Sequence, residues 1–373
     1  MMPETPIPSS WCEINLERVS RNIELTLGLL PACAAFCAVM KADAYGHGIH
    51  RIVPLLLEQG ISCIGITSNA EARAVRDAGF SDTLIRLRAA TPQEVEAALP
   101  DCVEEQVGSL AAARHLCGLR ENGQVHSGVH LALNAGGMSR DGLDISTQSG
   151  QLECREILDQ IGDSIVAIST HFPSNEPAPL KQSSELFRQQ VEWIFDNSDL
   201  NRTDILIHAG STLTLLSGAP IETDMYRCGA VLYGFLEPQL GFRPTMELKA
   251  QVVHLGIYPK GATVGYDCDF SLDADRRLAC ISIGYAAGYS RIAQDRGAVL
   301  IRGKRVPVLG KVSMNSIVAD VTDIADVQVG DTATVFGADA AETITTTTAV
   351  EQFHTILPDL YSDWGMRNPR VYR

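Results

Sequence analysis

The feature that most constrains the fold is a regular alternation of short β-rich runs with helix-period segments over the first two thirds of the chain. Helical spacing of apolar residues, with charged opposite faces, occurs at about 48–58, 68–79, 92–99 and 180–195. Strands that alternate with helices imply right-handed crossovers and a parallel sheet, and eight such units close into a (β/α)8 TIM-type barrel. The eight expected strands are 35–39, 61–67, 83–88, 103–107, 129–134, 165–170, 204–209 and 229–234.

The pattern changes after about residue 244. Short β-rich runs separated by Gly, Pro and Asp follow at 248–257, 278–283, 298–301, 305–309, 317–321 and 332–336. Helical periodicity largely disappears there, which predicts an all-β domain, either a small barrel or a sandwich. We therefore expect a barrel domain at 12–244 and a β domain at 245–373, with residues 1–16 packing against the latter.

Composition narrows the function. The 373 residues are 45% hydrophobic, which is enough for two cores, and 45 acidic against 30 basic residues give a net charge of −15. This charge repels nucleic acid and anionic membranes, and it suits an enzyme of small molecules. No segment approaches the roughly 20 apolar residues that cross a bilayer. The polar start at 1–11 lacks a secretory pattern, so we expect a cytoplasmic protein, or a periplasmic one if a signal has been removed.

Ten cysteines are scattered along the chain without CxxC or Cys/His metal spacing. This predicts no metal site and favours reduced cysteines in the core of a cytosolic protein. Cys37 and Cys63 fall on neighbouring expected strands, which leaves a disulfide between them open.

Lys41 ends the apolar run of the first expected strand and is followed by small residues, Tyr45 and two glycines. A lysine at the carboxyl end of a barrel strand lies where such folds build their sites, and partial burial makes the amine nucleophilic. It could hold a carbonyl cofactor as a Schiff base. The alternative is a surface lysine whose stem lies along the rim of the sheet.

Residues at the other strand ends include groups suited to bind a phosphate group and an aromatic ring of a ligand. Glycine-rich turns and hydroxyl residues at 210–212 and 228–230 fit phosphate binding through backbone N–H groups. His171 and His208 follow two further strands, and Arg140 and Arg227 are cations near strand ends. Each group alone would equally suit an ordinary turn, a core histidine or a surface charge. Together with the lysine they suggest pyridoxal phosphate.

The β domain contains segments richer in tyrosine, glycine and polar residues than strands require. They are 263–267, which contains Tyr266, 283–291, which contains Tyr285, and 310–315, which contains Met314. One interpretation is hairpin turns with edge tyrosines. The other is a catalytic tyrosine, since a desolvated phenol near cations can transfer protons.

The chain resembles the alanine racemase family along nearly its whole length, from WCEINL at 11–16 to Asn368-Pro369-Arg370. The segment VMKADAYGHG at 39–48 is the most specific signature. Within the family the chain looks closest to the broad-specificity amino-acid racemases, through LNAGGMSR at 133–140, SMN at 313–315 and WG at 364–365.

The resemblance implies a racemase that uses pyridoxal 5'-phosphate and two bases. Lys41 would hold the cofactor as a Schiff base and handle the D-enantiomer of an amino acid. Tyr266 would handle the L-enantiomer, and it would come from the partner subunit of a homodimer. Two bases on opposite faces are chemically sufficient to remove the Cα proton on one side and return it on the other.

The same resemblance assigns the remaining site residues. The implied phosphate ligands are Tyr45, Ser211, Thr212, Gly229 and Ala230. Arg227 would bond the pyridine nitrogen, which limits transamination, with His171 beside the ring. Arg140 would face the cofactor's phenolic oxygen and the substrate, Met314 would offer its backbone N–H to the substrate carboxylate, and Tyr285 would lie in the entry corridor.

Several positions depart from the alanine-specific pattern. Ala132 and Asn134 stand where that pattern has a lysine and an aspartate, so Arg140 lacks its usual anionic partner. Asn315 and Ala287 each replace an aspartate, and Met366 stands where a phosphate-binding tyrosine is expected. These changes favour a broad-specificity racemase that accepts basic and unbranched side chains as well as alanine and serine.

Three other interpretations remain. The main alternative is a strict alanine racemase, which only substrate profiling separates. A decarboxylase of the same fold would need a cysteine-bearing catalytic loop, which is not evident at 284–291. A non-catalytic cofactor carrier with the same barrel would have no β domain.

Overall fold

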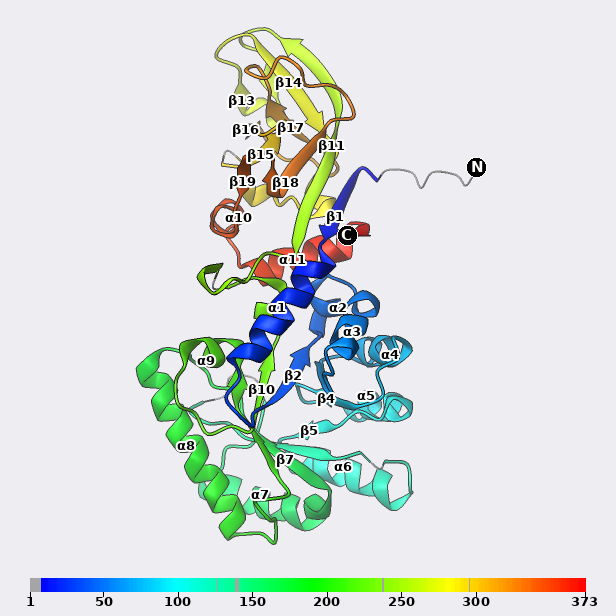
Figure 1. Cartoon of the computed structure of the whole chain (residues 1–373), viewed down its shortest axis with the longest axis vertical. Coiled ribbons are helices and arrows are strands. Elements are labelled where there is room, and N and C mark those ends of the chain that lie inside the picture. The colour runs from blue at the N-terminus through cyan, green and yellow to red at the C-terminus, as the bar shows by residue number, and fades with distance from the viewer. Residues whose placement is uncertain (1–7, 126, 138–140, 237, 295) are drawn as a thin grey trace. The chain divides into compact units, whose positions relative to one another are not determined.

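The computed structural model describes residues 8–125, 127–137, 141–236, 238–294 and 296–373. The chain divides into two compact units, whose elements are labelled in Figure 1. The barrel unit comprises Ile23–Ala44 and Ile49–Leu232. The β-rich unit comprises Tyr45–Gly48, Tyr233–Arg373 and the amino-terminal residues through Asn22.

The barrel unit is built on parallel strands. They are β2 (Ala35–Val39), β3 (Cys63–Ile66), β4 (Thr83–Arg86), β5 (Glu105–Val107), β6 (Val129–Ala132), β7 (Ile165–Ser169), β8 (Leu206–His208), β9 (Gly210–Ser211) and β10 (Met225–Cys228). They form the sheets β4-β3-β2-β10-β9 and β5-β6-β7-β8. A parallel bridge between Ile85 and Glu104 joins β4 to β5. Asp224 joins β8 to β10, since its N–H donates to the carbonyl of Ile207 and its carboxylate accepts the N–H of Ile207, both at 2.7 Å. The barrel is thereby closed.

Seven of the eight expected strands match β2 to β8, but the eighth prediction was wrong. The last strand is β10, whereas the expected run at 229–234 forms the 3-10 helix η3 (Ala230–Tyr233). Val231, Leu232 and Tyr233 are fully buried without being a strand. A short apolar run fits either conformation, and periodicity alone does not separate them.

Helices cover the barrel, and the four expected ones are present. The helices are α3 (Ile49–Glu58), α4 (Asn69–Asp77), α5 (Pro92–Ala97), α6 (Leu110–Glu121), α7 (Gln148–Ile161), α8 (Pro177–Asp196) and α9 (Thr212–Ser217). Capping boxes set the first residues of two of these helices. Ser68 caps α4 and Thr91 caps α5, and the side chain of Glu71 or Glu94 accepts the backbone N–H of the capping residue in return. An aliphatic and aromatic core fills the space between sheet and helices, as with Leu131, Ile157 and Phe187.

The β-rich unit closes into a second barrel. Its strands are β1 (Ser10–Ile14), β11 (Met246–Tyr258), β12 (Thr263–Val264), β13 (Phe270–Ser271), β14 (Arg276–Ile281), β15 (Ala298–Ile301), β16 (Lys304–Leu309), β17 (Ile317–Asp320), β18 (Thr332–Asp339), β19 (Glu342–Ile344) and β20 (Arg370–Tyr372). The main sheet runs β19-β18-β15-β16-β17-β14-β11-β1-β20, and β18 also pairs with β11. The second pairing of β11 closes the ring, and β1 extends it by pairing antiparallel with β11.

The carboxyl-terminal part is not purely β, because it also contains α10 (Thr346–Phe353) and α11 (Leu357–Arg367). Tyr361 and Trp364 of α11 are fully buried, and Phe336 of β18 packs against both rings. The amino-terminal helix α1 (Leu16–Leu29) follows β1 directly.

All ten cysteines lie among the described residues and are free thiols. The expectation of core cysteines is wrong for Cys33, Cys102 and Cys268, which are exposed. These three have positive φ angles of 72°, 49° and 56°, and Cys268 is the last residue of the 3-10 helix η5 (Tyr266–Cys268). Cys37 and Cys63 are buried neighbours on β2 and β3, and the hydrogen bond between their thiols, followed by burial, raises the pKa of the Cys63 thiol.

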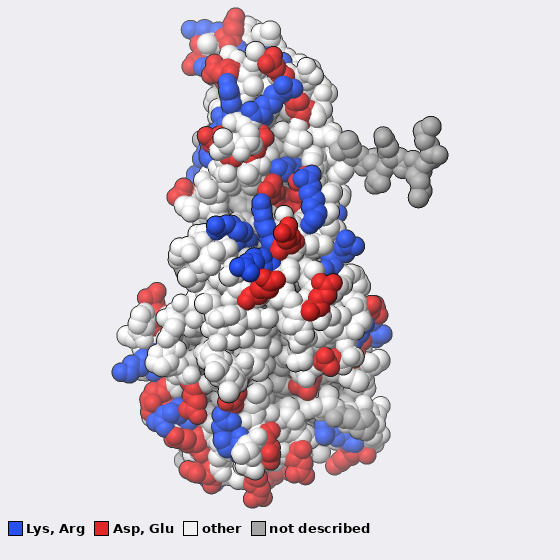
Figure 2. All heavy atoms as spheres, viewed as in Figure 1, with Lys and Arg blue, Asp and Glu red and all other residues white. Residues whose placement is uncertain are grey.

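Within the described ranges, no helix combines the length and apolar character that crossing a bilayer requires. On the face shown in Figure 2, acidic and basic side chains are interspersed rather than gathered into one basic surface.

Candidate active site

Lys41 lies two residues beyond the buried end of β2 and begins α2 (Lys41–Tyr45), a short turn whose backbone is in the left-handed conformation. Ala42, Asp43, Ala44 and Tyr45 have φ angles of 53°, 53°, 57° and 51°. Left-handed backbone costs roughly 1–2 kcal/mol for each residue with a side chain, so the surrounding structure must impose it.

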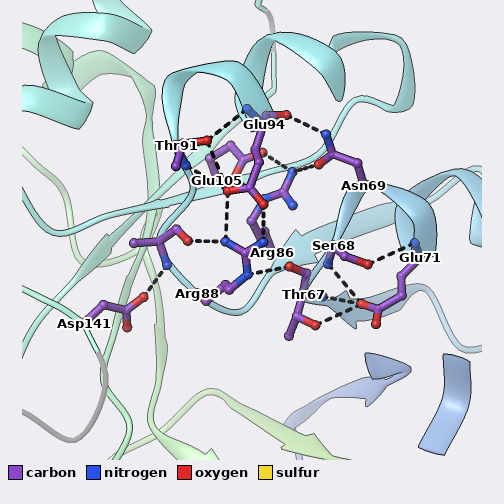
Figure 3. Close-up of polar contacts among 11 residues, drawn as sticks. Thr67, Ser68, Asn69, Glu71, Arg86, Arg88, Thr91, Glu94, Glu105 and Asp141 are labelled. Atoms are coloured by element: carbon purple, nitrogen blue, oxygen red, sulfur yellow. Dashed lines mark hydrogen bonds and ion pairs between the residues drawn. The ribbon is translucent and has the colours of Figure 1, made fainter. Parts of the chain in front are cut away.

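Glu71 of α4 supports this turn. One of its carboxylate oxygens accepts the N–H of Ala42 at 2.7 Å. The other accepts the backbone N–H groups of Thr67 at 2.7 Å and Ser68 at 3.0 Å, as Figure 3 shows. Asp43 adds a bond, because its carboxylate accepts the N–H of Ile49 at 2.8 Å. The residue after Lys41 is thus tied to the loop that follows β3.

A second network, also in Figure 3, rigidifies the neighbouring strand ends. The guanidinium of Arg86 donates to the carboxylate of Glu105 at 2.7 and 3.0 Å, and both side chains are buried. Arg88 donates to the carbonyl of Thr67 at 2.6 Å and pairs with Glu94. Hydrogen bonding to Arg88 lowers the pKa of Glu94 to about 2.

Four of the five predicted phosphate ligands, Ser211, Thr212, Gly229 and Ala230, lie near the end of β10. The register of β9 and β10 sets Ser211 opposite Arg227. Ser211 caps α9, and the hydroxyl of Thr212 accepts the N–H of Gly229 at 3.2 Å. Ala230 follows as the first residue of η3. Small residues, hydroxyls and backbone N–H groups therefore lie together at one strand end.

The same register brings this cluster to the strand that carries Lys41. Cys228 of β10 lies opposite Ala38 of β2, and these two strands are parallel. Lys41 lies three residues beyond Ala38, and Gly229 and Ala230 lie just beyond Cys228. The carboxyl ends of parallel neighbouring strands meet at the same edge of a sheet, which places the lysine and the phosphate-type cluster on one rim.

Arg227 lies in β10, where the sequence pattern placed it before the strand. It is buried, with 8% of its surface exposed. Its guanidinium donates to the carbonyl of Thr170 at 2.7 Å, to the carbonyl of His208 at 2.6 Å, and to Nδ1 of the same histidine. Burial, and then the charge of Arg227, lowers the pKa of His208 well below its usual value.

Three other predicted residues have different outcomes. His171 lies two residues beyond β7 and is partly buried. Tyr45 belongs to the β-rich unit, where its buried ring packs on Tyr233 with centroids 4.9 Å apart. Arg140 lies outside the described residues.

The β-rich unit gathers the other predicted residues around the segment 310–314. A Cβ on Gly265 would lie 2.7 Å from the backbone nitrogen of Lys311, so the loop that carries Tyr266 (η5, Tyr266–Cys268) packs tightly there. The ammonium of Lys311 donates to Asp267 at 2.7 Å. The N–H of Tyr285 donates to the carbonyl of Ser313 at 3.1 Å, which brings η6 (Tyr285–Ala287) to the same segment.

Tyr266, Tyr285 and Met314 are all exposed, at 59%, 38% and 53% of their surface. Exposed large side chains that gather around one segment are typical of a binding surface. The barrel unit and the β-rich unit thus each hold one cluster of predicted site residues.

Sequence reasoning missed some residues that support the barrel cluster. Glu71 was recognisable as the last residue of a Ser-x-x-Glu capping box after a strand. His130 and Glu104 had no recognisable sequence pattern. They lie 78 and 104 positions before His208, and only the folded barrel brings His130 into contact with His208 and with Glu104.

The chain combines a barrel, in which a lysine, hydroxyl groups and a buried arginine lie toward one rim, with a closed β-rich unit. This combination defines a class of two-unit α/β proteins. The chain belongs to the alanine racemase family. The family model "Alanine racemase, N-terminal domain" matches residues 14–237, and "Alanine racemase, C-terminal domain" matches residues 245–372.

Curated relatives cover nearly the whole chain. The chain is 40% identical to a protein named "Broad specificity amino-acid racemase" from Vibrio parahaemolyticus, over 99% of this chain and 91% of that protein. It is 35% identical to a "Lysine racemase" from Proteus mirabilis, with coverage of 98% and 90%. An "Alanine racemase" from Methanococcus maripaludis is 30% identical, with coverage of 97% and 98%.

Solved structures confirm the fold class. The alanine racemase of Streptomyces lavendulae matches with a TM-score of 0.89 at 24% identity, covering 99% of this chain and 98% of that one. An alanine racemase from Bartonella henselae, described "with covalently bound pyridoxal phosphate", matches with a TM-score of 0.85 at 22% identity, covering 99% and 100%.

Proposed function

We propose that this protein is a pyridoxal 5'-phosphate-dependent racemase that interconverts the L- and D-forms of several amino acids. The observation that carries the proposal is the pairing of β2 with β10: Lys41 and the Thr212–Gly229 contact lie beyond the same ends of these strands, and Arg227 lies buried within β10. Full-length relatives support it, because the proteins named broad-specificity and lysine racemases are 35–40% identical, against 30% for the named alanine racemase.

The residues present fit this cofactor. Lys41 offers an amine for its aldehyde, and the cluster of Ser211, Thr212 and Gly229 offers hydroxyls and backbone N–H groups for its phosphate. Arg227 has only N–H donors, so the ring nitrogen that it faces would be an unprotonated acceptor. Ala230, Tyr45, His171 and Arg140 are proposed as further cofactor contacts on the family resemblance.

The proposed chemistry is proton removal on one face of the substrate Cα and return on the other. The cofactor, when bound, supplies a ring system that takes up the electron pair left at Cα. Lys41 would move the proton of the D-enantiomer, and the hydroxyl of Tyr266 would move that of the L-enantiomer. Arg227 would keep the ring a moderate electron sink, which limits side reactions.

Substrate binding is proposed for the β-rich cluster. Met314 would present its backbone N–H to the substrate carboxylate, and Tyr285 would line the approach, with Arg140 on the cofactor side. Both exposed residues belong to segments that are hydrogen-bonded to each other. We propose a homodimer in which Tyr266 of each chain serves the site of the other, since Tyr266 is the more exposed of the two tyrosines in this cluster.

The first experiment is chiral chromatography after incubating purified protein with L-lysine, L-arginine, L-methionine, L-serine and L-alanine. We expect racemisation of the basic and unbranched amino acids, and its loss in Lys41→Ala. A matched control is Lys181→Ala, which removes an exposed lysine of α8 and should racemise normally.

The outcomes separate the alternatives. Turnover of alanine alone would identify a strict alanine racemase. Release of carbon dioxide without D-product would indicate a decarboxylase. Full activity in Lys41→Ala would overturn the assignment of the lysine.

A further inference from the structure

The barrel unit contains a line of four largely buried titratable side chains, of which the proposed reaction uses only Arg227. Glu104 precedes β5, His130 lies in β6, His208 in β8 and Arg227 in β10. His130 and His208 come from strands separated by β7, so their side chains meet only by pointing into the barrel interior. The exposed fractions are 1% for His130, 0% for His208 and 8% for Arg227.

These side chains are joined end to end by hydrogen bonds. Nε2 of His130 lies 2.7 Å from the carboxylate of Glu104, and Nδ1 of His130 lies 2.7 Å from Nε2 of His208. Nδ1 of His208 in turn contacts the guanidinium of Arg227. The imidazole rings of the two histidines meet at 75° with centroids 4.9 Å apart, which suits a bond between ring nitrogens.

The positions of the protons follow from the two ends of the line. Arg227 can only donate, so Nδ1 of His208 must accept and the proton of His208 lies on Nε2. That Nε2–H donates to Nδ1 of His130, so the proton of His130 also lies on Nε2. It then donates to Glu104, which can accept it as a carboxylate. Every bond therefore points from the cation at Arg227 toward the anion at Glu104, with two neutral rings between them.

We propose that Glu104, His130 and His208 are positioning residues that fix the direction of this hydrogen-bonded line and thereby hold Arg227 in place. The functional part of this inference rests on the proposed function, in which Arg227 faces the ring nitrogen of the cofactor. The burial of His208, which lowers its pKa, supports the neutral state of that ring.

The carboxylate is the group that sets the direction. If Glu104 is replaced by glutamine, the side-chain amide can donate to Nε2 of His130 instead of accepting from it. The proton of His130 then moves to Nδ1, which forces the proton of His208 to Nδ1 as well. An N–H of His208 would face an N–H of Arg227, and this clash would turn the guanidinium away.

The direct test is ¹⁵N NMR of histidine side chains in the full-length protein, with and without added pyridoxal 5'-phosphate. The chain has nine histidines, and His130→Gln and His208→Gln assign the two signals. We expect both rings to be neutral with the proton on Nε2, and Glu104→Gln to move the proton of His208 to Nδ1 in part or completely. This measurement on the unmutated protein requires no activity, so it stands even if the proposed function fails.

A matched control is Glu96→Gln, which removes a carboxylate 3.4 Å from His115 on the outer helices. It should leave both buried tautomers and the kinetics unchanged. A proton on Nδ1 of His208 in the unmutated protein would overturn the proposal, as would equal tautomers in Glu104→Gln and Glu96→Gln.

Kinetics provide the second test. In Glu104→Gln we expect kcat for racemisation to fall on the order of tenfold with KM little changed, as for residues that orient a site group through hydrogen bonds without touching the substrate. We also expect more transamination per turnover, read as release of the 2-oxo acid while the amino group stays on the cofactor. Because the line acts as a unit, the double variant Glu104→Gln/His208→Gln should have a kcat no lower than that of the less active single variant. Multiplied losses in the double variant would overturn the coupling.

Discussion

At the scale of single residues, the two proposed bases lie in opposite surroundings. Lys41 is partly buried in a turn held by Glu71, whereas Tyr266 exposes 59% of its surface. Proton transfer by a phenol is most effective where water is excluded. Tyr266 therefore needs a second surface to cover it before it can act, while the surroundings of Lys41 are largely formed within the barrel unit.

The separate roles of these bases predict a one-sided defect in Tyr266→Phe. We expect kcat for the L-enantiomer to fall about 10²- to 10⁴-fold, because the general base is lost. Exchange of the Cα proton of the D-enantiomer with D₂O should persist, since it requires only Lys41. ¹H NMR of each enantiomer in D₂O measures both rates. Tyr258→Phe, at another exposed tyrosine of the β-rich unit, is the control, and equal loss for both enantiomers would contradict two bases.

His208 predicts a pH dependence of stability. Its pKa is lowered by burial and by Arg227 and His130, so at pH values just below 6.5 the unfolded chain binds a proton that the folded chain does not. The free energy of unfolding should therefore rise with pH up to about 6.5, with a slope of at most about 1.4 kcal/mol per pH unit from this group.

Urea unfolding at pH 5.5 and 7.5 measures this contribution. In His208→Gln the difference between the two pH values should shrink, whatever the overall loss of stability. His115→Gln, at a partly exposed histidine of α6, should leave the difference unchanged. An unchanged difference in His208→Gln would show that His208 is not buried in the neutral state.

At the scale of elements, the sequence predicts what local periodicity and turn chemistry control. Seven barrel strands follow from these rules, and the capping boxes of α4 and α5 were recognisable by them although they were not predicted. The turn at 42–45 does not, because alanine and tyrosine disfavour left-handed backbone and only contacts such as Glu71 to Ala42 impose it. The line from Glu104 to Arg227 was equally invisible, since its members meet only across the closed barrel.

The two capping boxes offer a matched pair of variants. Glu71 and Glu94 occupy the same position in α4 and α5, but only Glu71 also binds the N–H beside Lys41. Both Glu71→Ala and Glu94→Ala should lose about 1 kcal/mol or more of stability through the cap. Only Glu71→Ala should also lose much of its kcat, because the turn that positions Lys41 loosens.

Thermal unfolding and racemase kinetics of the two variants test this difference. Equal kcat values in Glu71→Ala and Glu94→Ala would show that the bond to Ala42 does not position the lysine.

At the scale of the whole molecule, the predicted site is divided between two units. The barrel unit holds Lys41 and the cluster of Ser211, Thr212 and Gly229 that we propose as cofactor ligands, and the β-rich unit holds Tyr266, Tyr285 and Met314. Both family models match in order along one chain, so every subunit carries both halves. A homodimer can then build two equivalent sites by pairing the barrel unit of one chain with the β-rich unit of the other.

Subunit complementation tests this arrangement. Lys41→Ala and Tyr266→Phe are each expected to be inactive as racemases of L-substrates. When the two variants are co-expressed with different tags, random pairing makes half of the dimers mixed, and one of the two sites in each mixed dimer has both bases. The mixture should therefore regain about a quarter of the unmutated activity per chain. Co-expression of Lys41→Ala with the double variant Lys41→Ala/Tyr266→Phe leaves no intact site and should stay inactive. If both bases of a site came from one chain, co-expression of the single variants would restore nothing, because every site would lack one base.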